Sequence, residues 1–141
     1  MKKNKTGLKH KELTEKIIKA FYEVYNELGF GFLESVYQKA MAIVFRDYGL
    51  KVEEEKQIKV YFQGKVIGDY RADLWVNNII ILELKAAKTL VKEYEAQLLN
   101  YLRATNVEIG LLLNCGLKPQ FKRMIFDNSR KKQLIKSVVS V

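Results

Sequence analysis

The stretch RADLWVNNIIILELKAAK, residues 71–88, decides the fold of this chain. Its part IIILEL is so apolar that we expect both faces of the strand to be covered, which predicts a central strand of a sheet. The same stretch contains three ionisable side chains, Asp73, Glu83 and Lys85. A buried charge is costly unless it is paired or bound to a metal, so these residues require a structural or a chemical reason.

Periodic patterns predict the elements on both sides of this stretch. Apolar residues at helical spacing indicate helices, and apolar residues that alternate with polar ones indicate strands. The predicted helices lie within residues 13–28, 30–49 and 89–105, and the predicted strands lie at 58–62, from 66 to 76, at 79–85, 108–115 and 121–126. This order predicts an α/β or α+β fold in which helices pack against one sheet.

The composition predicts one domain over residues 1–141, since 141 residues with 48% hydrophobic content suffice for one core and not for two. The lone Cys115 cannot form an internal disulfide, which favours a reducing, cytoplasmic setting. No apolar run approaches the length of a membrane helix, so we expect no membrane association.

Positive charge is concentrated at the two ends of the chain. Residues 1–11 form a basic N-terminal extension, and residues 128–141 form a basic tail in which Lys131 and Lys132 could contact phosphates. The net charge is +9, and the middle of the chain is slightly acidic. This distribution suits a polyanion such as nucleic acid, although basic ends could also serve only solubility.

Glu83 and Lys85 stand two residues apart in the predicted strand, so both point to the same face. A plain salt bridge accounts for this pair alone. Asp73 changes the interpretation, because a second carboxylate beside Glu83 would repel it unless a hard cation such as Mg²⁺ or Mn²⁺ lay between them.

The loop at Asn77 and Asn78 decides whether Asp73 and Glu83 can meet. A two-residue turn opposes Val76 to Ile79 and places Asp73 on the face away from Glu83, which forbids a shared metal. A three-residue loop or one bulge shifts the register and places both carboxylates on one face.

Glu34 is a third acid of interest, in the first turn of the second predicted helix. The helix dipole favours an anion there, so helix capping alone explains it. Glu34 and Gln38 are nevertheless one turn apart at the edge of the apolar face, where a carboxylate could reach the sheet.

Three motifs resemble those of the small bacterial and archaeal GxxExxY proteins of the PD-(D/E)XK nuclease superfamily. GFLESVY, residues 31–37, matches the motif that names the group; Asp73 with the Glu83-Leu84-Lys85 run matches the D…ExK signature. QLLNY, residues 97–101, resembles the QxxxY element of some branches. The resemblance covers about residues 8 to 126 and implies a restriction-endonuclease-like αβββαβ core, with a mixed central sheet flanked by helices.

The resemblance also implies a role for each site residue. The expected ligands of Mg²⁺, or of Mn²⁺, are Glu34, Asp73, Glu83 and the backbone carbonyl of Leu84. Lys85 would orient or help deprotonate water, and a metal suits this task because attack on an anionic phosphodiester needs neutralised charge and a hydroxide-like nucleophile. The remaining pair, Gln97 and Tyr101, could touch the metal-bound water or a phosphate, or could simply be a hydrogen-bonded amide and a core-edge phenol.

The leading hypothesis is therefore a Mg²⁺-dependent nuclease that hydrolyses DNA, and a homodimer could cut both strands. Its rival is a catalytically silent module on the same fold that binds nucleic acid or protein. The complete set of Asp73, Glu83 and Lys85 favours the enzyme, because a binding module needs no such set.

Overall fold

The computed structural model describes residues 9–131 and contains three α-helices and five strands in the predicted order. The elements are α1 (Lys11–Leu28), α2 (Glu34–Asp47), β1 (Val52–Phe62), β2 (Lys65–Val76), β3 (Ile80–Lys85), α3 (Lys92–Arg103), β4 (Ile109–Cys115) and β5 (Pro119–Ile125), followed by the 3₁₀ turn η2 (Asn128–Arg130). The expected α/β class and its αβββαβ core, α2 to β4, are confirmed.

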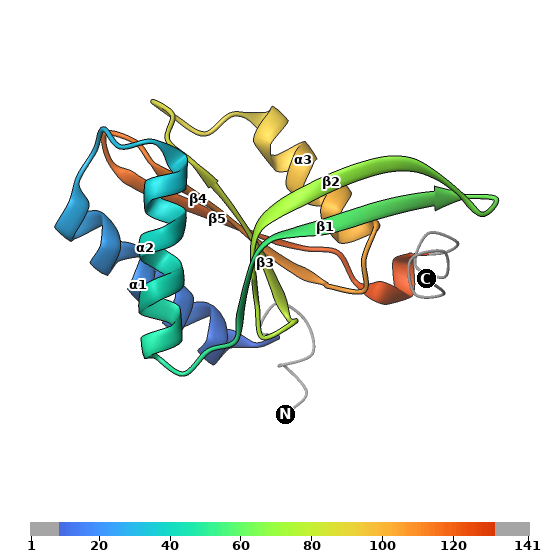
Figure 1. Cartoon of the computed structure of the whole chain (residues 1–141), viewed down its shortest axis with the longest axis horizontal. Helices are drawn as coiled ribbons and strands as arrows, with labels where there is room; N and C mark the ends of the chain where they lie inside the picture. The colour runs from blue at the N-terminus through green and yellow to red at the C-terminus, as the bar shows by residue number, and fades with distance from the viewer. Residues whose placement is uncertain (1–8, 132–141) are drawn as a thin grey trace.

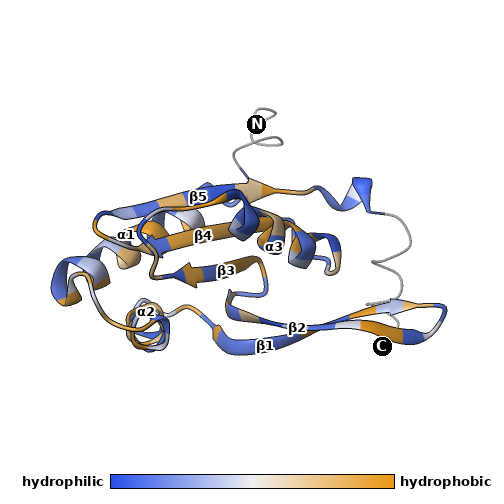
Figure 2. Ribbon diagram, turned by 90° about the horizontal axis from the view of Figure 1, so that it is seen from above, coloured by the Kyte–Doolittle hydropathy of each residue, from blue (hydrophilic) through white to orange (hydrophobic). Residues whose placement is uncertain are grey.

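The five strands form one mixed sheet in the order β1-β2-β3-β4-β5 (Figures 1 and 2). β3 and β4 are parallel and are joined through α3, and the other neighbouring pairs are antiparallel. β3 is the middle strand and all of its residues except the last are buried, as the sequence predicts. Figure 2 shows β3 and β4 as largely apolar ribbons between more polar edges.

Each face of the sheet has its own apolar core. On one face α1 and α2 pack against alternate residues of the central strands, including Leu82 and Leu84. On the other face α3 packs through Leu98 and Leu102 against residues such as Ile81. Burial of a large apolar side chain stabilises a fold by about 1.5–3 kcal/mol, so the two cores together hold the sheet between its helices.

The loop between β2 and β3 is three residues long. Val76 pairs with Ile80, and Asn77 and Asn78 have positive φ angles of 52° and 58°, a conformation that asparagine tolerates. The side-chain oxygen of Asn77 accepts a hydrogen bond of 2.8 Å from the amide of Lys51, which anchors the loop to β1. The three-residue alternative is therefore confirmed, and the two-residue turn is wrong.

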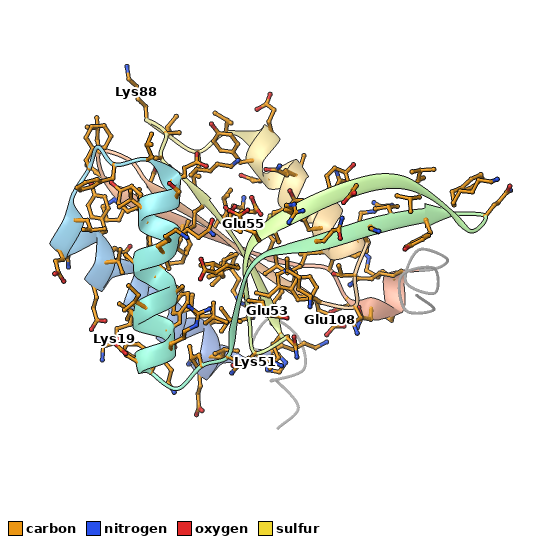
Figure 3. The ribbon with its side chains drawn as sticks, viewed as in Figure 1. Lys19, Lys51, Glu53, Glu55, Lys88 and Glu108 are labelled. Atoms are coloured by element: carbon orange, nitrogen blue, oxygen red, sulfur yellow. The ribbon has the colours of Figure 1, made fainter. Side chains whose placement is uncertain are left out.

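β1 and β2 bend near the middle and continue as a two-stranded arm beyond α3 (Figure 1). β1 begins at Val52 and not at Ile58. The sequence pattern did not predict this earlier start, because the acidic run 53–55 does not alternate with apolar residues. Glu55 has a φ of 52°, and Figure 3 labels it near the bend of β1. The arm ends in a turn at Gln63 and Gly64, both with positive φ.

Two details differ from the sequence analysis. Helical spacing within residues 30–49 places Leu33 on the apolar face with Tyr37, but Leu33 precedes α2 as its N-cap and is 76% exposed. Lys131 was expected in the basic tail, but it is buried, and its Nζ donates to the carbonyls of Thr105 and Val107 at 2.9 and 2.8 Å. It therefore has no free ammonium for a phosphate.

Lys132, the second lysine expected to contact phosphates, lies outside the described residues, as do the first eight residues of the basic extension. Lys9 belongs to the folded body, because its Nζ contacts Glu108 at 3.0 Å. Within residues 9–131, no helix is long and apolar enough to cross a membrane.

Candidate active site

The carboxylates of Asp73 and Glu83 lie side by side where β2 leaves β3. The ladder between these strands ends at the pair Leu74 and Leu82. Beyond it, Asp73 N donates to Glu83 Oε2 at 3.1 Å, and Leu84 N donates to Asp73 Oδ2 at 2.7 Å. Side-chain oxygens thus replace the backbone bonds of the ladder, and the predicted pair shares one face.

This carboxylate pair is strongly desolvated. Burial and the neighbouring charge of Asp73 raise the pKa of Glu83 to about 8, and burial is also the main cause that raises the pKa of Asp73. The charges of Glu34 and Glu55 raise the pKa of Asp73 further. Four acidic side chains from α2, β1, β2 and β3 therefore lie close enough to repel one another, which favours a bound cation at this place.

Glu34 lies at the rim of this site. It begins α2 and is exposed, so it is not the buried-edge carboxylate that the sequence analysis allowed. The loop before it is fixed by Tyr37, whose hydroxyl donates to the carbonyl of Gly29 at 2.5 Å and accepts from the amide of Phe32 at 3.3 Å. Gly31 has a φ of 117°, which explains a glycine there.

Lys85 lies on the same side of the sheet as Glu83, at the end of β3. Its Nζ donates to Gln97 Oε1 at 3.3 Å and stands 4.7 Å from the centroid of the Tyr94 ring. No salt bridge between Lys85 and Glu83 is found among the described residues, so the plain Glu-Lys pair does not explain these charges. The lysine is instead held by side chains of α3.

Tyr101 completes the α3 side of the site. It is 3% exposed and stands one helical turn after Gln97 on the same face of α3. Burial, followed by the negative charges of Glu83 and Asp73, raises the pKa of its phenol to about 12. The phenol therefore remains protonated at neutral pH and can donate a hydrogen bond.

Asn114 fixes the segment that follows Lys85. It is fully buried, its Oδ1 accepts from Ala87 N and its Nδ2 donates to Ala87 O, both at 3.0 Å. A Cβ at Gly116 would come within 2.3 Å of the same carbonyl, so this position requires glycine. β4 thus holds the end of β3 where the lysine stands.

The donors suit a hard divalent cation, because carboxylate oxygens are the ligands that Mg²⁺ and Mn²⁺ prefer and a cation would relieve the repulsion of the pair. Asp73 and Glu83 are the part of the expected ligand set that the structure brings into contact. Over residues 9–131, no three His, Cys, Asp or Glu side chains are placed as a complete ligand set. The charges of Glu34 and Glu55 raise the pKa of Asp73, and that of Glu34 also raises the pKa of Glu83.

The expected residues Asp73, Glu83, Lys85, Gln97 and Tyr101 therefore converge, with Glu34 nearby. Two neighbours, Glu55 and Tyr94, were missed, and Gln38 was noted only as a partner of Glu34 at the edge of a helix face. Glu55 lies in an acidic run that gave no signal of a site. The Nε2 atom of buried Gln38 lies 3.5 Å from Glu55 Oε2. The ring of Tyr94 contacts the ammonium group of Lys85. The spacing of Tyr94, Gln97 and Tyr101 on one helix face is the signal that could have found Tyr94.

The sequence profile of the PD-(D/E)XK nuclease superfamily matches residues 11–124 of this chain. The chain therefore belongs to the PD-(D/E)XK nuclease superfamily, and its mixed five-stranded sheet is consistent with the restriction-endonuclease-like fold. Members of the superfamily are usually nucleases and typically use divalent metals.

Two further comparisons accompany this match. The crystal structure of SSO0001 resembles the chain with a TM-score of 0.46 and 16% sequence identity, over 66% of this chain and 50% of that one. This chain thus spans about half the length of that protein. A search among curated proteins finds no significant match.

Proposed function

We propose that this chain is a Mg²⁺-dependent nuclease of the GxxExxY group that hydrolyses DNA phosphodiester bonds at the site of Asp73, Glu83 and Lys85. The observation that carries the proposal is the buried carboxylate of Glu83 beside the half-buried carboxylate of Asp73, each bonded to a backbone amide, with a lysine on the same side of the strand. A purely structural role would not require two repelling carboxylates at one place.

Each residue has a proposed task. Asp73, Glu83, the carbonyl of Leu84 and Glu34 would hold the cation. When bound, a divalent cation neutralises phosphate charge and lowers the pKa of water.

Lys85, positioned by Gln97, provides positive charge where negative charge develops during attack on the phosphate. Tyr101, protonated at neutral pH, donates a hydrogen bond toward a phosphate oxygen. Gln97 is a neighbour of both side chains, since it accepts a hydrogen bond from Lys85 and stands one helical turn before Tyr101 on α3. Its removal would therefore disturb the lysine and the phenol together.

The test is a single-turnover cleavage assay with Mg²⁺ and with Mn²⁺ on branched, single-stranded and duplex DNA. Lys85→Ala should bind DNA nearly as wild type does and cut at least ~10²-fold more slowly, because the interaction it removes strengthens in the transition state. Lys88→Ala, an exposed lysine after the same strand, is the matched control and should cut normally.

The rival is a catalytically silent module on the same fold. If wild type and Lys85→Ala are equally inert on every substrate while DNA binding persists, the rival is correct. RNA substrates in the same assay decide whether the enzyme is restricted to DNA.

A further inference from the structure

The arm formed by β1 and β2 exposes aromatic rings on the side of the sheet that α3 covers. Tyr70 is the register partner of Ile58, so these two share one face. The register shifts between Val60 and Tyr61 by one extra residue in β2 and none in β1, so Phe62, at an even spacing from Ile58 in β1, keeps that face. Ile58 is buried in the core beneath α3, whereas Tyr70 is 41% exposed and Phe62 is 58% exposed. The face thus continues from the core onto open surface along the arm, whose strands carry apolar segments just before the tip in Figure 2.

The ring of Tyr70 lies over Gly68. A Cβ at Gly68 would come within 3.0 Å of a ring carbon of Tyr70, so the absence of a side chain makes room for the ring. Gly68 is nearer the tip of the arm than Tyr70. The ring therefore extends along the strand toward the tip, and its outer surface is open to a ligand.

This face is continuous with the candidate active site. The ring centroids of Tyr70 and Tyr101 are 5.7 Å apart. Burial is the main cause that raises the pKa of Tyr101, and the nearby charges of Glu83 and Asp73 raise it further. A ligand strand lying on the arm would therefore pass directly toward the carboxylate pair.

The arm is also positively charged. Residues 56–71 contain the bases Lys56, Lys59, Lys65 and Arg71, and their single acid, Asp69, accepts a hydrogen bond of 2.8 Å from Gln57. Lys65 is the register partner of Phe62, so an ammonium group stands on the same face as the exposed ring. Lys59 and Arg71 alternate with Ile58 and Tyr70 and therefore lie on the opposite face, and Lys56 contacts Glu53 at 3.1 Å. Exposed rings beside the ammonium group of Lys65 match the two needs of an unpaired nucleic-acid strand, base stacking and phosphate neutralisation.

We infer that the Tyr70–Phe62 face, with Lys65, is a stacking platform that binds single-stranded nucleic acid and leads it to the site of Asp73 and Glu83. The inference rests on the proposed function and narrows its substrate to strands with unpaired bases. Bases in a duplex are already stacked on one another and cannot lie on these rings, whereas an unpaired base of any type can.

The test is fluorescence anisotropy in EDTA, so that no strand is cut, with a labelled oligothymidylate of about 20 nucleotides, longer than one small binding module covers. The second probe is a duplex of the same length. Tyr70→Ala and Phe62→Ala should each weaken single-strand binding on the order of 10-fold and leave duplex binding unchanged, and Tyr70→Trp should keep it. Ile43→Ala, an exposed apolar residue on α2, is the control and should change neither.

Three results would overturn the inference. The first is no change in single-strand affinity for either aromatic variant, and the second is an equal loss on both probes. The third is self-association of wild type in light scattering that Tyr70→Ala abolishes, which would make the arm a protein interface.

Cleavage measured in parallel keeps the two proposals separate. A protein that cuts duplex DNA and is unaffected by Tyr70→Ala retains the proposed function and loses the platform. A protein that cuts nothing, but binds single strands through Tyr70, retains the platform and loses the nuclease.

Discussion

The two sides of β3 differ in what they bury. Leu82 and Leu84 point toward α1 and α2, and they are 0% and 1% exposed in a hydrophobic core. Glu83 and Lys85 point toward α3, where Glu83 is only 3% exposed and contacts the backbone of Asp73. One strand thus carries a conventional core on one side and a buried charge on the other.

The difference lies in the neighbouring strand. From the hairpin loop back to Leu74, β2 pairs regularly with β3. The ladder stops there, so Asp73 and Leu84 lie beyond its end. The amides of Asp73 and Leu84 then bond to carboxylate oxygens instead of to carbonyls. A central strand can therefore hold a buried carboxylate where its neighbour separates and supplies donors to it, because a buried polar group is tolerated once it is hydrogen-bonded.

The largest effect is expected on the apolar side. Leu82→Ala leaves a cavity between the sheet and its helices, and it should lower the free energy of unfolding by about 2–5 kcal/mol. Urea denaturation measures this loss. Ile43→Ala removes a similar side chain from the surface and should change stability by less than about 0.5 kcal/mol. Equal losses in the two variants would contradict the packing described for this side.

The next effect concerns the polar side and divalent cations. If the carboxylate pair binds Mn²⁺, the cation should raise the free energy of unfolding by about 2.7 kcal/mol at a hundredfold excess over Kd. Thermal unfolding at increasing Mn²⁺ concentration measures it. Asp73→Asn should weaken the response, and Asp69→Asn, on the arm, should not. A melting temperature that is indifferent to millimolar Mn²⁺ in wild type would count against the site.

A smaller effect is the pH dependence of the metal-free protein. The pKa of Glu83 is raised by burial, and next by Asp73, from its ordinary 4.5 to about 8. Because the folded-state pKa is the higher one, the protonated group stabilises the fold fully below about pH 4.5, and this stabilisation is lost as pH rises through about 8. The slope is at most about 1.4 kcal/mol per pH unit for one proton.

Denaturation in EDTA between these two pH values measures that slope. Glu83→Gln should remove it, because the amide does not titrate. The same slope in wild type and variant would assign the titration to another group.

Sequence patterns predicted the elements well where the periodicity was long. Helices α1 and α3 and the strands β3 and β4 were found with nearly their true limits, since each has an uninterrupted apolar face. β1 was found only from Ile58, because Glu53, Glu54 and Glu55 do not alternate with apolar residues. The irregular backbone at Glu55 is stabilised by contacts with Gln38 and Arg71, which lie outside its own segment. No local sequence pattern therefore predicts it.

The sequence by itself determined the order of the elements, the apolar faces and the residue types that could form a site. It left two registers open for the β2–β3 hairpin, and only the tertiary structure decided between them. The anchoring of Asn77 to the amide of Lys51 joins residues 26 positions apart, so no local propensity contains it. That contact accompanies a three-residue loop, the loop sets the register, and the register places Asp73 beside Glu83. Tertiary packing likewise removed Lys131 from the surface, because carbonyl groups of the α3–β4 connection accept hydrogen bonds from its ammonium group.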